Sequence, residues 1–71
     1  MIITHYWELQ REQIIPDQGQ VWNVVRGWYI KPTEQQIKEA FDKSQNYKGS
    51  TENWRLFKTT SHIEIVARNT N

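Results

Sequence analysis

The segment Pro16-Asp17-Gln18-Gly19 constrains the fold more than any other feature, because it separates two stretches that both favour β-strand. Met1–Ile15 alternates apolar and polar residues, and Gln20–Ile30 is rich in Val, Trp, Tyr and Ile. Proline presets φ at the second position of a turn, aspartate can hydrogen-bond its own backbone, and glycine accepts the left-handed conformation on which such loops usually end. The segment therefore predicts a β-hairpin in which Ile15 pairs with Gln20.

Counting outward from this turn assigns the hairpin side chains to two faces, since successive strand residues point in opposite directions. Trp7 then falls opposite Trp28, and Tyr6 falls opposite Tyr29. The face predicted to be core carries Ile3, Trp7, Leu9, Trp22, Val24, Trp28 and Ile30. The face predicted to be solvated carries Thr4, Tyr6, Glu8, Gln10, Glu12, Asn23, Val25 and Tyr29. An alternative interpretation ends the first strand near Leu9 and leaves Gln10–Gln20 as a loop.

The segment Thr33-Glu34-Gln35-Gln36 matches a capping box, in which the Thr hydroxyl and the Gln side chain each bond the other residue's backbone N–H. It predicts a helix over residues 34–45. The apolar stripe of that helix consists of Ile37, Ala40, Phe41 and Ser44. Two i,i+4 ion pairs are also expected, Glu34 with Lys38 and Glu39 with Lys43. A helix this short depends on docking against the sheet.

Residues 53–68 predict a second pair of strands that turns at Thr60-Ser61. With that turn, one face carries Trp54, Leu56, Ile63, Ile65 and Ala67, and the other carries Arg55, Phe57, His62, Glu64, Val66 and Arg68. Two-residue turns favour Gly or Asn at positive φ, so a longer turn stays open. An alternative interpretation makes Thr51–Lys58 a short second helix.

These segments predict one α+β domain over residues 1–71, a small antiparallel sheet (hairpin, helix, hairpin, or ββαββ) with one helix packed on one face. A chain of this length buries only about 60% of its unfolded surface. Because cysteine is absent, aromatic packing or self-association has to replace disulfide bonds. No apolar run approaches the ~20 residues of a membrane span, and no basic signal-peptide start is present. We therefore expect a cytoplasmic protein without a membrane partner.

The sequence holds no motif for catalysis, so we expect no enzyme activity, no cofactor and no small-molecule substrate. A zinc site would need both histidines, His5 and His62, from opposite ends of the chain. His62-Ile63-Glu64 matches only half of the zinc deaminase signature, because the cysteine half is missing. Gly27, inside a predicted strand, indicates a bulge or close packing beneath an aromatic ring.

A single short helix covers one face of the predicted sheet, and the other face gathers residue types that are enriched at protein interfaces. We hypothesise that this face binds a protein partner or a second copy of the chain through Tyr6, Tyr29, Arg55, Phe57 and Arg68, with Val25 and Val66 beside them. The alternative is single-stranded nucleic acid, bound by cations that alternate with rings. The candidate cations are Arg26, Lys31, Arg55, Lys58 and Arg68. A net charge of only +1 gives this alternative little electrostatic support.

Overall fold

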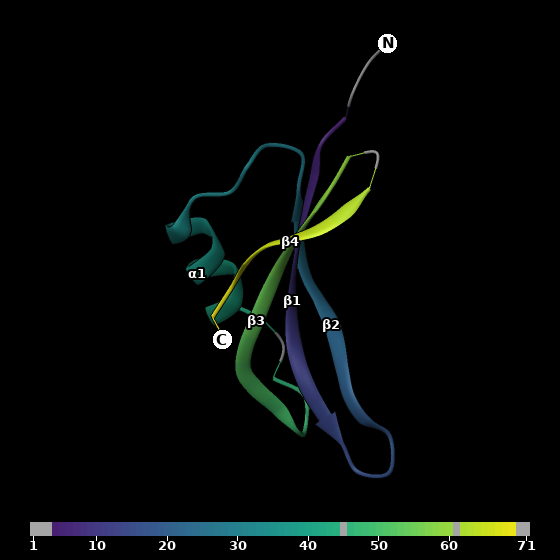
Figure 1. The fold of residues 1–71 in the computed structure, drawn as a ribbon. Helices are drawn as coiled ribbons and strands as arrows, with labels where there is room; N and C mark the ends of the chain where they lie inside the picture. The colour runs from purple at the N-terminus through teal and green to yellow at the C-terminus, as the bar shows by residue number, and fades with distance from the viewer. Residues whose placement is uncertain (1–3, 45, 61, 70–71) are drawn as a thin grey trace.

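The computed structural model describes residues 4–44, 46–60 and 62–69 and shows a twisted antiparallel sheet with a helix beside it (Figure 1). Along the chain the elements are β1 (Tyr6–Ile15), β2 (Gly19–Trp28), α1 (Glu34–Asp42), β3 (Ser50–Thr59) and β4 (Ile63–Arg68). The strand order in the sheet is β2-β1-β3-β4, so β1 and β3 are central. The prediction of a four-stranded antiparallel sheet with one helix is therefore confirmed for the described residues.

Both alternative interpretations are wrong, since Gln10–Ile15 belongs to β1 and Thr51–Lys58 belongs to β3. The predictions that place Ile3 in the core, Gln45 at the helix end and Ser61 in the second turn lie outside the described residues.

The capping box forms as predicted and starts α1. Gln36 N donates to Thr33 Oγ1 at 3.1 Å, and Thr33 N donates to Gln36 Oε1 at 2.9 Å. The helix ends at Asp42, earlier than predicted, because Ser44 N and Ser44 Oγ both donate to the carbonyl oxygen of Phe41. Neither predicted ion pair forms among the described residues. In this part of the chain no helix is long and apolar enough to cross a membrane.

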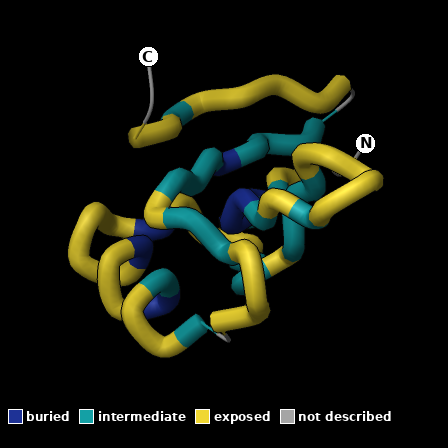
Figure 2. Tube along the Cα trace, turned by 90° about the horizontal axis from the view of Figure 1, so that it is seen from below, coloured by how far each residue is buried: buried dark blue, intermediate teal, exposed yellow. Residues whose placement is uncertain are grey.

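The core lies between the sheet and α1, and Figure 2 shows buried residues on both the strands and the helix. Leu9 is completely buried, with none of its surface exposed. The other buried apolar residues are Trp7, Ile37, Ala40 and Leu56. The half-buried side chains that pack around them are Val25, Trp28, Phe41, Trp54 and Ala67. A core this small depends on every one of these contacts.

The first hairpin turns one residue earlier than predicted. Ile15 pairs with Gly19, so Pro16, Asp17 and Gln18 alone form the loop. A β-bulge at Val25 then adds one residue to β2. The shorter loop and the bulge shift the strand pairing by one residue in opposite directions. Beyond the bulge these shifts cancel, and Trp7 lies opposite Trp28 as predicted.

Between the loop and the bulge, each β2 side chain points to the face opposite the predicted one, because a shift of one residue reverses a strand. Trp22 and Val24, predicted in the core, pair with Glu12 and Gln10 and so lie on the face away from α1. The other corrected residues of this segment are Asn23 and Val25, which lie on the α1 side. Ile30, predicted in the core, follows the end of β2 and is 83% exposed.

The second hairpin also differs from the prediction in the length of its turn and in a bulge. Its turn is longer than the predicted Thr60-Ser61, since Thr59 pairs with Ile63, and a bulge at Val66 interrupts β4. Ala67 lies on the core face, as predicted, and pairs with Leu56, but the strand is reversed between the bulge and the turn. The corrected positions are Ile63 and Ile65 on the face away from α1, and Glu64 and Val66 on the α1 side.

The first turn contains strain that a substitution can remove. Gln18 N donates to the carbonyl oxygen of Ile15 at 3.1 Å, and Asp17 has φ +72°, which is typical of the third position of a type II turn. Because that position favours glycine, we expect Asp17→Gly to raise the free energy of unfolding by up to about 1 kcal/mol in chemical denaturation.

The matched control is Gln18→Gly, at a residue without positive φ. It adds only backbone freedom to the unfolded chain, so we expect it to lower the free energy of unfolding by about 0.5–1 kcal/mol. If both variants are destabilised equally, the turn assignment is wrong.

Candidate protein-binding face of the sheet

The face of the sheet away from α1, called the open face below, is defined by the observed strand pairing. Each central residue pairs with residues that point the same way, such as Gln10 with both Val24 and Arg55. The face carries Tyr6, Glu8, Gln10, Glu12, Trp22, Val24, Arg55, Phe57, Ile63 and Ile65. It is therefore richer in apolar residues than the sequence predicted.

Arg55 joins three strands at the centre of the open face. Its guanidinium lies 4.2 Å from the ring centroid of Trp22 and 4.4 Å from that of Phe57, so the cation is held between two π faces. Its Nε donates to Gln10 Oε1 at 2.7 Å, and Gln10 Nε2 donates to Glu8 Oε2 at 2.6 Å. Burial lowers the pKa of Arg55, and the Glu8 carboxylate opposes that shift. The Arg55 charge thus binds side chains of the face itself.

Tyr6 and Tyr29 form a second aromatic group at the end of the open face where β2 leaves the sheet. Their ring centroids lie 5.1 Å apart, with the ring planes tilted by 55°. Tyr6 rests on Gly27, because a Cβ built there would lie 1.8 Å from the Tyr6 hydroxyl oxygen. The prediction that Gly27 packs closely beneath an aromatic ring is confirmed. Tyr29 remains 73% exposed, so most of this ring is open to contact.

Glu12 is the buried acidic residue of the open face, and it lies where the pairing of β1 with β3 is irregular. Its carboxylate accepts hydrogen bonds from Gln20 Nε2, from Thr51 Oγ1 at 2.9 Å and from Asn53 Nδ2 at 3.0 Å. These bonds lower the pKa of Glu12, since they favour the ionised form. Sequence reasoning missed this cluster because its partners are far apart along the chain.

The predicted binding residues are divided into groups. Arg55 and Phe57 lie in the central cluster, and Tyr6 and Tyr29 form the aromatic pair. Arg68 pairs with Arg55 across β3 and β4 and is exposed at the edge. Val25 and Val66, predicted beside them, are on the α1 side instead. The prediction missed four apolar residues of the open face. They are Trp22, Val24, Ile63 and Ile65, and the correct loop lengths would have assigned them to this face.

The cations of the nucleic-acid alternative do not line one surface. Arg55 is enclosed by rings on the open face. Lys58 lies over Trp7 at 5.6 Å on the α1 side, and Arg26 lies over Trp28 at 5.4 Å. A strand-binding surface needs rings and cations together on one track. Of the five candidates, only Lys31 and Lys58 lie together, beside Trp7 on the α1 side.

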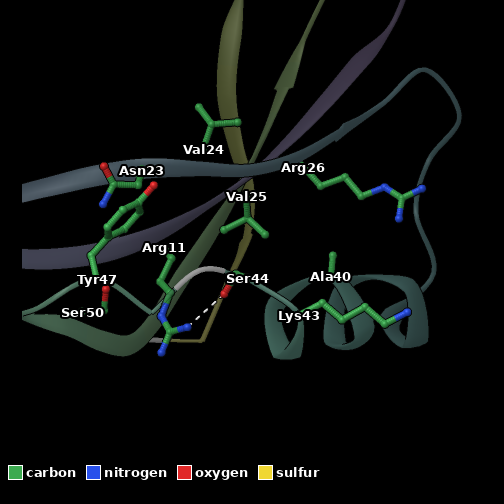
Figure 3. Close-up of a pocket in the computed structure, with 10 residues that line it drawn as sticks. All are labelled: Arg11, Asn23, Val24, Val25, Arg26, Ala40, Lys43, Ser44, Tyr47 and Ser50. Carbon is green, nitrogen blue, oxygen red and sulfur yellow. Dashed lines mark hydrogen bonds between the residues drawn. The ribbon is translucent and has the colours of Figure 1, made fainter.

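A hollow of about 350 Å³ lies between β2 and α1 (Figure 3). Arg11 reaches it from β1 and donates to Ser44 Oγ at 2.9 Å, while its Nε donates to Thr51 O at 2.8 Å. Arg26 and Lys43 also line the hollow, but both extend away from Arg11 in Figure 3. The three cations therefore do not converge. The hydrogen bonds of Arg11 connect β1 with β3 and with Ser44, just after the end of α1.

The histidines lie apart from one another. The His5 ring is 5.9 Å from that of Trp7, and His62 Nε2 is 3.6 Å from Glu64 Oε2. Over the described ranges, no group of three or more His, Asp or Glu side chains is placed to hold a metal ion.

No protein-family model matches the chain, and no curated protein or solved structure matches it. The function is therefore inferred from the geometry of its surfaces.

Glu12 makes stability depend on pH. Its folded-state pKa is below the usual value of 4.5, so its contribution is present above that value and is lost as the pH falls through the folded-state pKa. We expect Glu12→Gln to lower the free energy of unfolding at pH 7, with a deficit that shrinks steadily in acid. Urea denaturation at a series of pH values measures it.

The control for this series is Glu39→Gln on the exposed surface of α1. The free energy of unfolding of this variant should change with pH in the same way as that of the unmodified protein. A Glu12→Gln deficit that stays constant down to about pH 3 contradicts the assignment.

Proposed function

We propose that this chain is a non-catalytic, cytoplasmic protein-interaction module that self-associates through the open face. The observation that carries the proposal is the set of exposed apolar side chains on that face. Val24 is 61% exposed, Ile63 is 67% exposed and Ile65 is 47% exposed. They adjoin the Trp22, Arg55 and Phe57 cluster, and Trp, Arg and Tyr are the types that dominate interface hot spots.

The surface area of the chain supports burial of one whole face. The accessible surface is 5468 Å² for a mass of 8.6 kDa. A compact monomer of this mass exposes about 4,700 Å². The excess, roughly 800 Å², equals the area that one partner contributes to a standard interface.

The polar groups of the open face suit a sheet packed against it. Glu12 and Gln10 already have hydrogen-bond partners within the face, and the Arg55 guanidinium lies between two rings, so covering these groups removes few hydrogen bonds to water. Two sheets pack about 10 Å apart with their side chains interleaved. Because a two-fold interface uses the same patch on both subunits, one apolar face is enough to build it.

Mass in solution tests the proposal. We expect a mass about twice 8.6 kDa at high concentration, measured by sedimentation or light scattering. Ile65→Lys places an unpaired charge in the interface, and we expect it to weaken the dimer about thirtyfold or more. Val24→Lys, on the opposite edge strand, should have the same effect.

The matched control is Ile30→Lys, since Ile30 is more exposed than either residue but follows the sheet. It should dimerise like the unmodified protein. A monomer at millimolar concentration contradicts self-association. Binding to mixed oligonucleotides that weakens steeply with salt would instead support the nucleic-acid alternative.

A further inference from the structure

A groove runs between α1 and β4, on the side of the sheet away from the open face. It consists of two adjoining hollows of about 370 and 460 Å³, which share Glu34, Ile37 and Ala67. The apolar residues of one hollow include Trp7, Leu56 and Val66, and those of the other include Phe41 and Trp54. The groove therefore has an apolar floor with one indole in each hollow.

The groove exists because α1 is too short to cover its side of the sheet. Nine helical residues are about 13 Å long, and α1 packs over β1 and β2. The half of the face formed by β3 and β4 keeps half-buried side chains, among them Trp54 and Ala67, that α1 does not cover. A second helix is the element that normally completes such a layer.

The charged residues along the groove are mostly basic. Three lysines line it, Lys31 and Lys58 at one end and Lys38 at the other. Arg68 also borders the second hollow, but it pairs with Arg55 and so points to the open face. In the described part of the chain, no carboxylate lies within 4.0 Å of any of the three lysines. Of the two carboxylates that line it, Glu64 already lies 3.6 Å from His62. The groove thus presents positive charge at both ends of an apolar floor.

We propose that this groove binds an amphipathic helix of a partner protein, with apolar side chains along one face and Asp or Glu at both ends. Such a helix is recognised through apolar anchors spaced at i, i+4 and i+7. Ile37 and Ala67 separate the two hollows, so successive anchors can enter one hollow each. The acidic ends then meet the three lysines. This site does not depend on the open face, because it lies on the opposite side of the sheet.

The probe is a synthetic helical peptide of about three turns, with Leu at i, i+4 and i+7 and Glu at both ends. The matched peptide has Lys in place of each Glu. In ¹H–¹⁵N spectra of the unmodified protein, we expect the acidic peptide to shift the indole N–H signals of Trp7 and Trp54. The Trp22 indole lies on the open face and serves as the internal control. The basic peptide should bind at least tenfold more weakly.

A charge reversal separates recognition from nonspecific adhesion. The double variant Lys38→Glu with Lys58→Glu should reverse the preference, so that the basic peptide binds more tightly. Ile65→Lys alters only the open face, so it should weaken the dimer and leave peptide binding unchanged. This variant therefore distinguishes failure of the dimer from failure of the groove.

Three results would overturn the proposal. The first is no shift of Trp7 or Trp54 with the acidic peptide at about 1 mM. The second is a shift of Trp22 as large as that of Trp54, and the third is a preference for the acidic peptide that survives the charge reversal. Unchanged backbone signals elsewhere in the variant establish that it is folded.

Discussion

The burial of Leu9 in the middle of β1 is the contact on which the rest of the structure depends. Leu9 is fully buried in the described chain, and its strand lies between β2 and β3. Because side chains alternate along a strand, fixing Leu9 toward α1 also fixes its neighbours Glu8 and Gln10 toward the open face. One packing contact thereby sets both the core and the polar framework that holds Arg55.

How far the sequence predicts this fold depends on whether the signal is local. The capping box at Thr33 and the position of the first turn follow from neighbouring residues, and both were predicted. The pairing of Trp7 with Trp28 was also predicted, because the shorter loop and the bulge cancel. The faces of β2 and β4 near their turns were not, because each loop differs by one residue from its predicted length. Such a shift reverses every side chain up to the next bulge, and the bulges have no sequence signature.

The polar parts of the open face were harder to predict for another reason. Thr51 and Asn53 reach Glu12 across roughly 40 positions of sequence, and Gln10 reaches Arg55 over a similar distance. Such bonds exist only once the strands have paired, so composition and spacing carry no trace of them. Tyr6, Arg55 and Phe57 were nevertheless placed on the correct face, because the alternation of side chains along β1 and β3 was predicted correctly, and Tyr29 packs beside Tyr6 as predicted.

The two bulges also limit what kind of assembly this sheet can join. Val25 and Val66 lie on β2 and β4, the two strands with a free edge. A bulge increases local twist and breaks the even row of backbone donors and acceptors that another strand would need. Copies of the chain are thus hindered from adding edge to edge without limit. Growth of a fibril through the edges of this sheet is therefore disfavoured.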